Sequence, residues 1–136
     1  MADISIIVPV ADNEDCWQHL CFDIAKLKNE IKVIYVISKH NSQFIESFDK
    51  LKPKNSKVIK CDKDNRASFM NFAAKKTNSN YLWFLHADSR ISEDLYESLI
   101  GSINKNPDSL HFFSLKFYNA PVPIFINEIG AYIRSI

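Results

Sequence analysis

The sequence predicts an α/β protein built on a mostly parallel sheet, with helices on both faces. Short apolar runs rich in β-branched and aromatic residues alternate with segments whose apolar residues recur at helical spacing. The first of these runs has almost no polar interruption, as expected of a strand that is covered on both faces. Polar residues gather directly after several runs, at the edge where parallel sheets bind ligands.

The composition fits a single domain spanning residues 1–136. The chain is 46% hydrophobic and 24% charged, and its net charge of +1 excludes the basic footprint of a nucleic-acid-binding protein. No apolar run approaches the ~20 residues of a membrane span, and the N-terminus lacks a signal-peptide pattern. Three cysteines in no metal spacing are typical of reduced thiols, so we expect a cytoplasmic protein.

The first predicted strand covers residues 4–10, and Pro9 near its end fits a strand terminus because proline lacks the backbone donor. Asp12 or Asn13 is expected to cap the helix that follows. The buried face of this helix is predicted to carry Trp17, Leu20, Cys21, Ile24 and Leu27. Residues 31–37 predict the second strand.

The next elements repeat the alternation. Ser42 is expected to cap a helix that ends before Pro53, residues 58–61 predict a short third strand, and residues 66–76 predict a helix. Apolar residues at helical spacing in these two helices are Phe44, Ile45, Phe48, Leu51, Phe69, Met70, Ala73 and Ala74. The pattern therefore indicates two more strand–helix units of the same sheet.

A buried, aromatic-rich strand is predicted at residues 81–88, with His86 and Asp88 at its carboxyl end. Because side chains alternate along a strand, these two residues would point the same way. Such a pair could hold a divalent ion that neutralises a phosphate. The alternative is that Asp88 only shapes a turn before the next helix, since aspartate is a favoured turn residue.

The last third of the chain predicts a helix capped by Ser92 and ended at Pro107, a fifth strand at residues 110–118, and a final helix after a break at 120–123. The sequence stops inside that helical pattern, so we expect a fold truncated at its C-terminus. Only two glycines are present, which excludes Gly-rich phosphate loops. A bound phosphate would need a metal, a basic side chain or a helix N-terminus.

Three segments, in this order, resemble family 2 glycosyltransferases. Residues 5–14 are similar to the opening strand and turn "S-I-I-I-P-x-x-N-E", and residues 65–74 resemble "G-R-A-x-x-x-N-x-G-A". Residues 85–91 resemble the metal motif "L-H-A-D-T-x-L" of one branch, where most members have D-x-D. Residues 113–117 and 130–135 are similar to that branch's next strand and helix. The ordered set covers nearly the whole chain.

The resemblance implies a GT-A fold, a Rossmann-like sheet that binds a nucleotide diphosphate sugar, and a glycosyltransferase assisted by Mn²⁺ or Mg²⁺. It implies that the metal-bearing strand lies beside the first strand, where the strand order reverses. Asp88 and His86 would hold the ion, which stabilises charge on the departing nucleoside diphosphate. The implied nucleotide-sugar contacts are Pro9, Val10, Asn13, Glu14, Ser38, Arg66, Asn71 and Ala87.

Several of these residues also have an ordinary structural explanation. Asn13 and Glu14 could start a helix, where a negative charge is favourable. Arg66 could be a solvated charge, although the motif match favours a contact with the diphosphate or with Asp88. His86 could be a buried strand histidine that is hydrogen-bonded to a neighbour.

Two departures from the family pattern leave a second function open. The family carries a base-binding acid after its second strand, whereas the run from Ser38 to His40 has no carboxylate. The catalytic base is expected beyond residue 136, as is the half that binds the still unknown acceptor. The alternative is a degenerate, non-catalytic α/β domain acting through protein–protein contacts, with homo-oligomers formed through an exposed apolar surface. A nucleotidyltransferase is disfavoured because residues 11–14 are not a Gly-rich basic loop.

Overall fold

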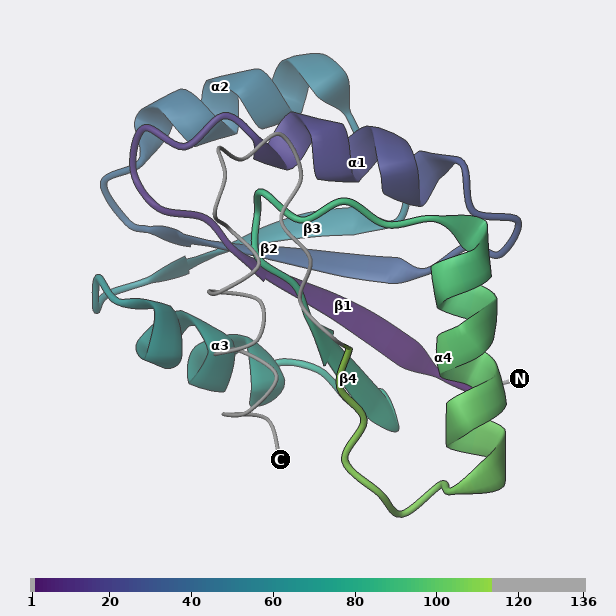
Figure 1. The fold of residues 1–136 in the computed structure, drawn as a ribbon. Helices are drawn as coiled ribbons and strands as arrows, with labels where there is room; N and C mark the ends of the chain where they lie inside the picture. The colour runs from purple at the N-terminus through teal and green to yellow at the C-terminus, as the bar shows by residue number, and fades with distance from the viewer. Residues whose placement is uncertain (1, 114–136) are drawn as a thin grey trace, which may run out of the picture. The chain divides into compact units, whose positions relative to one another are not determined.

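A computed structural model describes residues 2–113 of the protein. Four parallel strands form one sheet with the order β3-β2-β1-β4 (Figure 1). The strands are β1 (Ile4–Pro9), β2 (Lys32–Ser38), β3 (Ser56–Cys61) and β4 (Tyr81–Phe84). The helices are α1 (Trp17–Ala25), α2 (Ser42–Leu51), α3 (Arg66–Ala74) and α4 (Glu93–Lys105). The predicted parallel α/β sheet is therefore confirmed.

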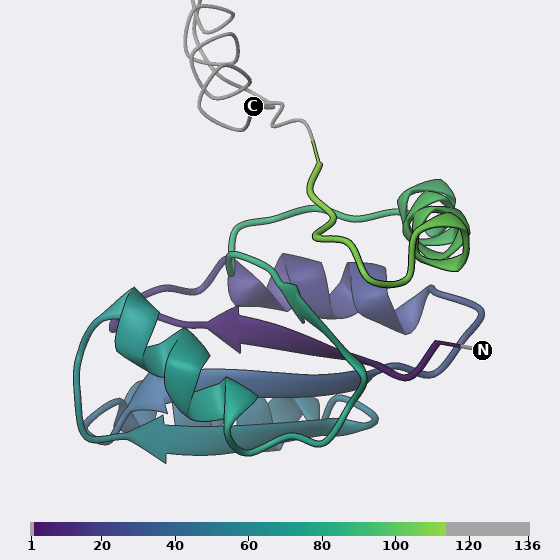
Figure 2. The ribbon, with the colours of Figure 1, turned by 90° about the horizontal axis from the view of Figure 1, so that it is seen from below.

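The chain divides into two compact units, Met1–Ile100 and Gly101–Ile136. The first unit holds the whole sheet, with α1 and α2 on one face and α3 on the other (Figures 1 and 2). In the second unit, His111 bonds to the Ser102 hydroxyl at 2.8 Å through Nδ1, and its Nε2 lies 3.0 Å from the Asn106 carbonyl oxygen.

Strand β1 is the centre of the sheet because it pairs with β2 on one side and β4 on the other. Ile6, for example, lies between Val33 and Trp83 in the register. All six residues of β1 are buried, which confirms that the strand is covered on both faces. The chain passes from β1 to β2 through α1 and from β3 to β4 through α3, so the direction of winding reverses between β1 and β4. Open α/β sheets bind ligands at such a point.

The core has one layer on each face of the sheet. Beneath α1 and α2, Trp17 lies 4.6 Å from Phe44 and 5.6 Å from Tyr35 between ring centroids, and edge or tilted ring contacts of this kind add to the area buried. Beneath α3, the buried residues are Ile7, Ile34, Val36, Cys61, Phe69 and Ala73. Among the residues of the predicted helical faces, Trp17, Leu20, Phe44, Phe69 and Ala73 are buried, whereas Leu27 lies beyond the end of α1 at Ala25.

The structure corrects two predicted helix starts. Helix α1 begins at Trp17, and Cys16 occupies its N-cap position without a side-chain hydrogen bond that caps the helix, so the predicted caps at Asp12 or Asn13 are wrong. The turn between β1 and α1 is simply longer than the sequence pattern indicated. Helix α2 is capped by Asn41, whose Oδ1 accepts the Phe44 N–H at 3.1 Å, and not by Ser42. Asparagine and serine are both good caps, so adjacent candidates are hard to separate by pattern.

Two predicted strands also need correction. Strand β4 ends at Phe84, four residues before the predicted end at Asp88, because the chain turns after Leu85. The described part of the predicted fifth strand, residues 110–113, has no strand structure. The remainder of that strand and the predicted final helix lie outside the described residues.

Candidate functional site

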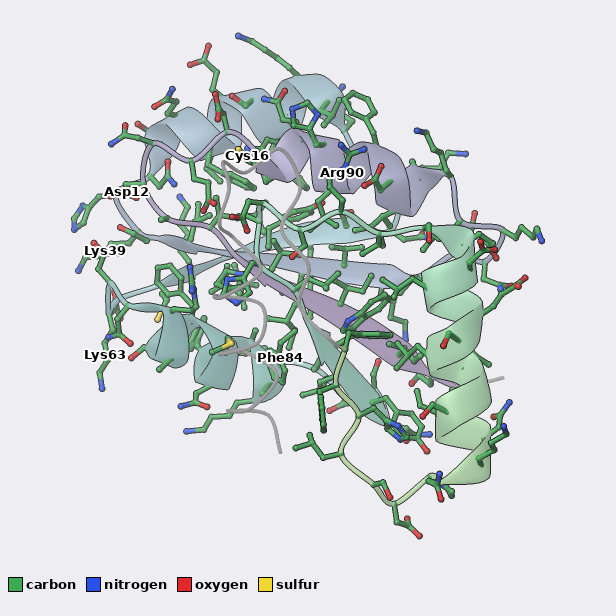
Figure 3. All side chains as sticks on the ribbon, in the orientation of Figure 1. Asp12, Cys16, Lys39, Lys63, Phe84 and Arg90 are labelled. Carbon is green, nitrogen blue, oxygen red and sulfur yellow. The ribbon has the colours of Figure 1, made fainter. Side chains whose placement is uncertain are left out.

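The loops that follow β1 and β4 leave the sheet side by side at its carboxyl edge. Beyond the strand ends, the Val10 N–H still donates to the Val36 carbonyl at 2.9 Å, and the Leu85 N–H donates to the Ile7 carbonyl at 3.0 Å. Figure 3 shows the side chains at the same edge. Asp12, Lys39 and Lys63 lie along it, on the loops that follow β1, β2 and β3 respectively. Segments distant in the sequence therefore meet where ligands of parallel sheets bind.

Residues 11–14 form a tight turn at this edge. The Glu14 N–H donates to the Ala11 carbonyl at 3.3 Å, and the Glu14 carboxylate accepts the Ala11 N–H at 3.2 Å. Asn13 has a φ of 62°, a left-handed conformation that asparagine tolerates better than most residues. Asn13 is exposed and Glu14 is half-buried. The turn, rather than a helix start, fixes these two predicted site residues.

His86 and Asp88 lie in a turn as well. The Ser89 N–H donates to the His86 carbonyl at 3.0 Å, which places Ala87 and Asp88 at the two central positions. Both residues lie beyond the end of β4, so strand alternation gives no basis for the predicted alignment of their side chains, which stays a prediction. His86 is exposed, so its interpretation as a buried strand histidine is wrong. The predicted turn geometry at Asp88 is confirmed, and Asp88 is exposed while Ala87 is buried beneath it.

The donor set at this turn is compatible with a hard divalent ion completed by other ligands. Among residues 2–113, no group of three or more His, Cys, Asp and Glu side chains gathers as a metal site. Mg²⁺ commonly binds through one or two carboxylates together with water and substrate phosphate oxygens. The exposed carboxylate of Asp88 suits that mode, in which the phosphates of a ligand complete the coordination, whereas the His86 imidazole is a softer ligand than Mg²⁺ prefers.

Two other predicted contacts, Ser38 and Arg66, lie at the end of β2 and the start of α3, whereas Asn71 lies further along α3. Ser38, at the end of β2, is buried, and its hydroxyl accepts the His40 N–H at 3.2 Å, so this side chain shapes the loop. Arg66 is the first residue of α3, directly after the cap formed by Asn65, whose Oδ1 accepts the Ser68 N–H at 2.9 Å. Arg66 and the later Asn71 are exposed.

Pro9 and Val10 are buried at the end of β1. A ligand could therefore meet only their backbone without displacing core side chains. A small pocket of about 60 Å³ lies close by, with Asn13, Glu14, Asn41 and Phe44 among the residues that line it. Asn41 was not identified from the sequence, which predicts the neighbouring Ser42 as the helix cap.

An ion pair between the buried Asp23 and the half-exposed Arg90, next to the Asp88 turn, was also missed. Arg90 Nε and Nη2 donate to the two carboxylate oxygens of Asp23 at 2.6 and 2.9 Å, and the Ile91 N–H donates to the same carboxylate at 3.2 Å. Asp23 is 6% exposed, and its hydrogen bonds with Arg90 lower the pKa of this carboxyl. The sequence held one signal: Asp23 follows Leu20 by three residues and precedes Leu27 by four, which puts a carboxylate on the apolar face of a helix.

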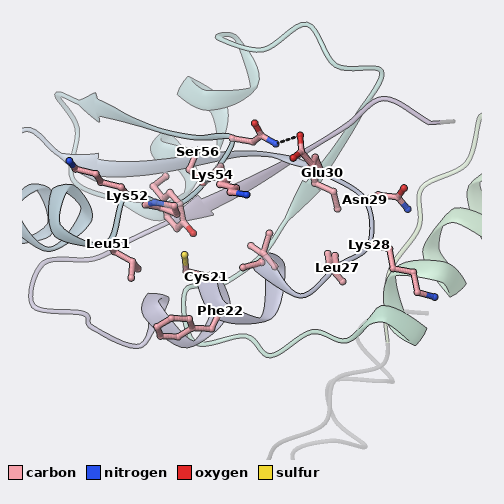
Figure 4. A pocket seen from close by; sticks show the side chains of 16 residues that line it. Cys21, Phe22, Leu27, Lys28, Asn29, Glu30, Leu51, Lys52, Lys54 and Ser56 are labelled. Carbon is pink, nitrogen blue, oxygen red and sulfur yellow. Dashed lines mark hydrogen bonds between the residues drawn. The ribbon is translucent and has the colours of Figure 1, made fainter.

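A larger cavity, of about 470 Å³, lies at the opposite edge of the sheet (Figure 4). Its lining comes from the end of α1 and from the segments that precede β2 and β3, including Leu27, Lys52 and Lys54. The Asn55 amide donates to the Glu30 carboxylate at 3.1 Å between those two segments. Size alone would favour this cavity, but the polar turns and the reversal of strand order are at the other edge, and we take that edge as the functional site.

A parallel sheet with two polar turns at its reversal point is a Rossmann-like arrangement, in which ligands bind outside the carboxyl ends of the strands. The model of the family "Glycosyl transferase family 2" matches residues 5–127, and the chain belongs to this family. The match includes the turns at 11–14 and 86–89 as well as α3. No curated protein matches the sequence.

Solved structures show the same fold at low identity. The crystal structure of S. aureus TarS matches with a TM-score of 0.68 and 19% identity over 89% of this chain and 23% of TarS. A structure of TarS residues 1–349 matches with a TM-score of 0.67 and 18% identity over 92% of this chain and 40% of that chain. CMP:2-keto-3-deoxy-manno-octonic acid synthetase complexed with CTP matches with a TM-score of 0.59 and 11% identity over 79% of this chain and 49% of that chain. The fold is thus the Rossmann-like GT-A fold, and the chain spans less than half of each neighbour.

Proposed function

We propose that this chain binds a nucleotide diphosphate sugar between the turns at 11–14 and 86–89. It would act as the donor-binding part of a glycosyltransferase, which transfers the sugar to an acceptor that is not yet identified. One observation carries the proposal. The family match includes both turns, and the pairing of β4 with β1 brings them to the same edge of the sheet. Exposed polar side chains on both turns leave room for a ligand at that edge.

In this proposal, Asp88 is the main ligand of Mn²⁺ or Mg²⁺, and His86 assists it. When bound, the ion would offset the negative charge that develops on the leaving nucleoside diphosphate. Asn13 and Glu14 would contact the nucleotide sugar from the facing turn. The remaining proposed contacts are Pro9, Val10, Ser38, Ala87, Arg66 and Asn71. A catalytic base is not assigned within the chain.

Calorimetric titration with UDP and with GDP, each with and without Mn²⁺, tests the donor site. Asp88→Asn removes the charge but keeps the shape of the side chain, and we expect it to abolish the metal-dependent part of binding. Asp49→Asn is the matched control, because Asp49 is an exposed carboxylate on α2 away from both turns. Absence of heat with both nucleotides in wild-type protein, or equal binding by Asp88→Asn, would contradict the proposal.

The Ser38 geometry favours a second candidate, a domain that acts through protein–protein contacts. The resemblance implies an acidic residue after the second strand, whereas the run from Ser38 to His40 has no carboxylate and the buried Ser38 hydroxyl already accepts a backbone N–H. This candidate predicts no nucleotide binding and concentration-dependent self-association, which sedimentation velocity would detect. Monomeric protein that binds UDP or GDP would exclude it.

We propose the cytoplasm as the compartment. Cys16 is exposed, Cys21 and Cys61 are buried, and all three are free thiols, as expected in a reducing environment. Within residues 2–113, none of the helices combines the length and the apolarity that a membrane span requires.

A further inference from the structure

The turn that carries His86 and Asp88 is held at both ends. On its first side, the Leu85 N–H continues the ladder to β1 through the Ile7 carbonyl at 3.0 Å. On its second side, Arg90 and the Ile91 N–H both donate to the Asp23 carboxylate of α1. The segment between these attachments is short, so the position of the turn depends directly on the two anchors.

The second anchor is directional in a way that an apolar contact is not. A guanidinium bound to both oxygens of a carboxylate fixes orientation as well as distance. Asp23 is nearly enclosed, whereas the Arg90 side chain is 47% exposed, so the carboxylate is the fixed partner on the helix and the arginine is the group that it holds. Figure 3 shows Arg90 over α1, consistent with this attachment.

Net stability gives little reason for an ion pair at this position. Apolar residues of similar volume often replace buried ion pairs with no loss of stability. Leu20, which precedes Asp23 by three residues on α1, and Leu27, which follows the end of α1 at Ala25, are buried apolar residues, so an apolar residue at position 23 would continue this pattern. Unlike an apolar contact at this place, the ion pair fixes the path of the backbone immediately after the Asp88 turn.

We propose that Asp23 and Arg90 are positioning residues that hold the Asp88 turn in the geometry required for metal-dependent nucleotide binding. This inference rests on the proposed function. Asp23 is engaged by Arg90 and by the Ile91 N–H, so its proposed action on the site runs through the backbone of residues 86–91. Loss of outer partners of this kind commonly weakens metal sites by about 10- to 100-fold.

Two variants separate positioning from simple support of the fold. Asp23→Asn keeps an oxygen that can accept the Ile91 N–H but removes the charge, and Arg90→Lys keeps the charge but loses the two-point contact. Glu46→Gln is the control, because Glu46 forms an exposed ion pair with Lys50 at 3.0 Å on α2. Each protein is titrated with UDP and GDP in Mn²⁺ at a temperature where thermal melting shows it fully folded.

We expect both variants to bind the nucleotide about 10-fold or more weakly, with Glu46→Gln unchanged. Amide hydrogen exchange without ligand should be faster at residues 86–91 in both variants, with β1 and β2 as protected as in wild type. Nucleotide affinity within twofold of wild type in both folded variants would overturn the inference.

The exchange measurement also separates this inference from the proposed function. If wild-type protein binds neither nucleotide, the proposed function fails, and exchange alone then decides whether the pair holds the turn. Faster exchange confined to residues 86–91 would support the positioning role. Unchanged exchange there, or a uniform increase over the sheet, would overturn it.

Discussion

The ion pair between Asp23 and Arg90 also makes a quantitative prediction for folding. Arg90→Ala removes two charge-assisted hydrogen bonds and leaves the Asp23 carboxylate, which is 6% exposed, with the Ile91 N–H as its remaining described donor. Breaking a fully buried pair by deleting one partner costs about 3–5 kcal/mol. Because the Arg90 side chain is 47% exposed, water can enter the space it leaves, and we expect a smaller loss of about 2 kcal/mol.

Urea unfolding of the single and double variants measures this loss. Arg90→Ala, Asp23→Ala and the double variant form a thermodynamic cycle whose coupling energy should be about 1–2 kcal/mol at pH 7. The dependence of unfolding free energy on urea should stay constant, because the area exposed on unfolding barely changes. Glu46→Ala, at an exposed pair, should change stability by no more than about 0.5 kcal/mol.

The same pair sets a pH dependence whose sign follows from the pKa of Asp23. Hydrogen bonds from Arg90 lower this pKa in the folded protein, while in the unfolded chain it is about 3.9. The unfolded state therefore takes up the proton first as the pH falls. The stabilisation is complete above the unfolded pKa and is lost as the pH falls through the folded pKa. A loss below about 0.5 kcal/mol for Arg90→Ala at pH 7, or an equal loss at pH 7 and in strong acid, would refute this reasoning.

Two further substitutions test the core and a helix start. Tyr35→Phe removes a buried hydroxyl that has no hydrogen bond of ordinary geometry, although the Cys21 thiol lies beside it. Thermal melting should therefore show a stability that is unchanged or higher by about 1 kcal/mol. A clear loss of stability would reveal a hydrogen bond to that thiol. Asn65→Ala removes the cap of α3 and should lower the urea unfolding free energy by about 1 kcal/mol, and an unchanged value would mean that water replaces the cap.

Local patterns in the sequence were sufficient for the layers of the fold. The uninterrupted apolar run at the N-terminus became β1, buried along its whole length, and the helical repeats that begin at Trp17 and Phe44 became the faces that pack on the sheet. Helix starts were less predictable, because several capping residues stand side by side in the turns. The end of β4 was misjudged because apolar residues continue to Leu85 and Ala87 although the chain has already turned.

The candidate site was predicted in part. The resemblance pointed to Asp88 and to the Asn13-Glu14 turn, and the pairing of β1 with β4 confirms that these turns share one edge. The predicted alignment of His86 with Asp88 lost its basis in strand alternation, because both residues lie beyond the end of β4 at Phe84. Whether the remaining predicted contacts bind a nucleotide sugar stays a prediction.

The sequence by itself determined the order of strands and helices, their buried faces and the family motifs, because each depends on the spacing of residues close together in the chain. Tertiary structure alone decided which distant segments meet. Asp23 and Arg90 are 67 residues apart, and the sequence around either residue does not indicate that the two form a pair. Their pairing follows from β4 returning beside β1, so that the segment after β4 reaches α1, a long-range arrangement that periodicity cannot encode.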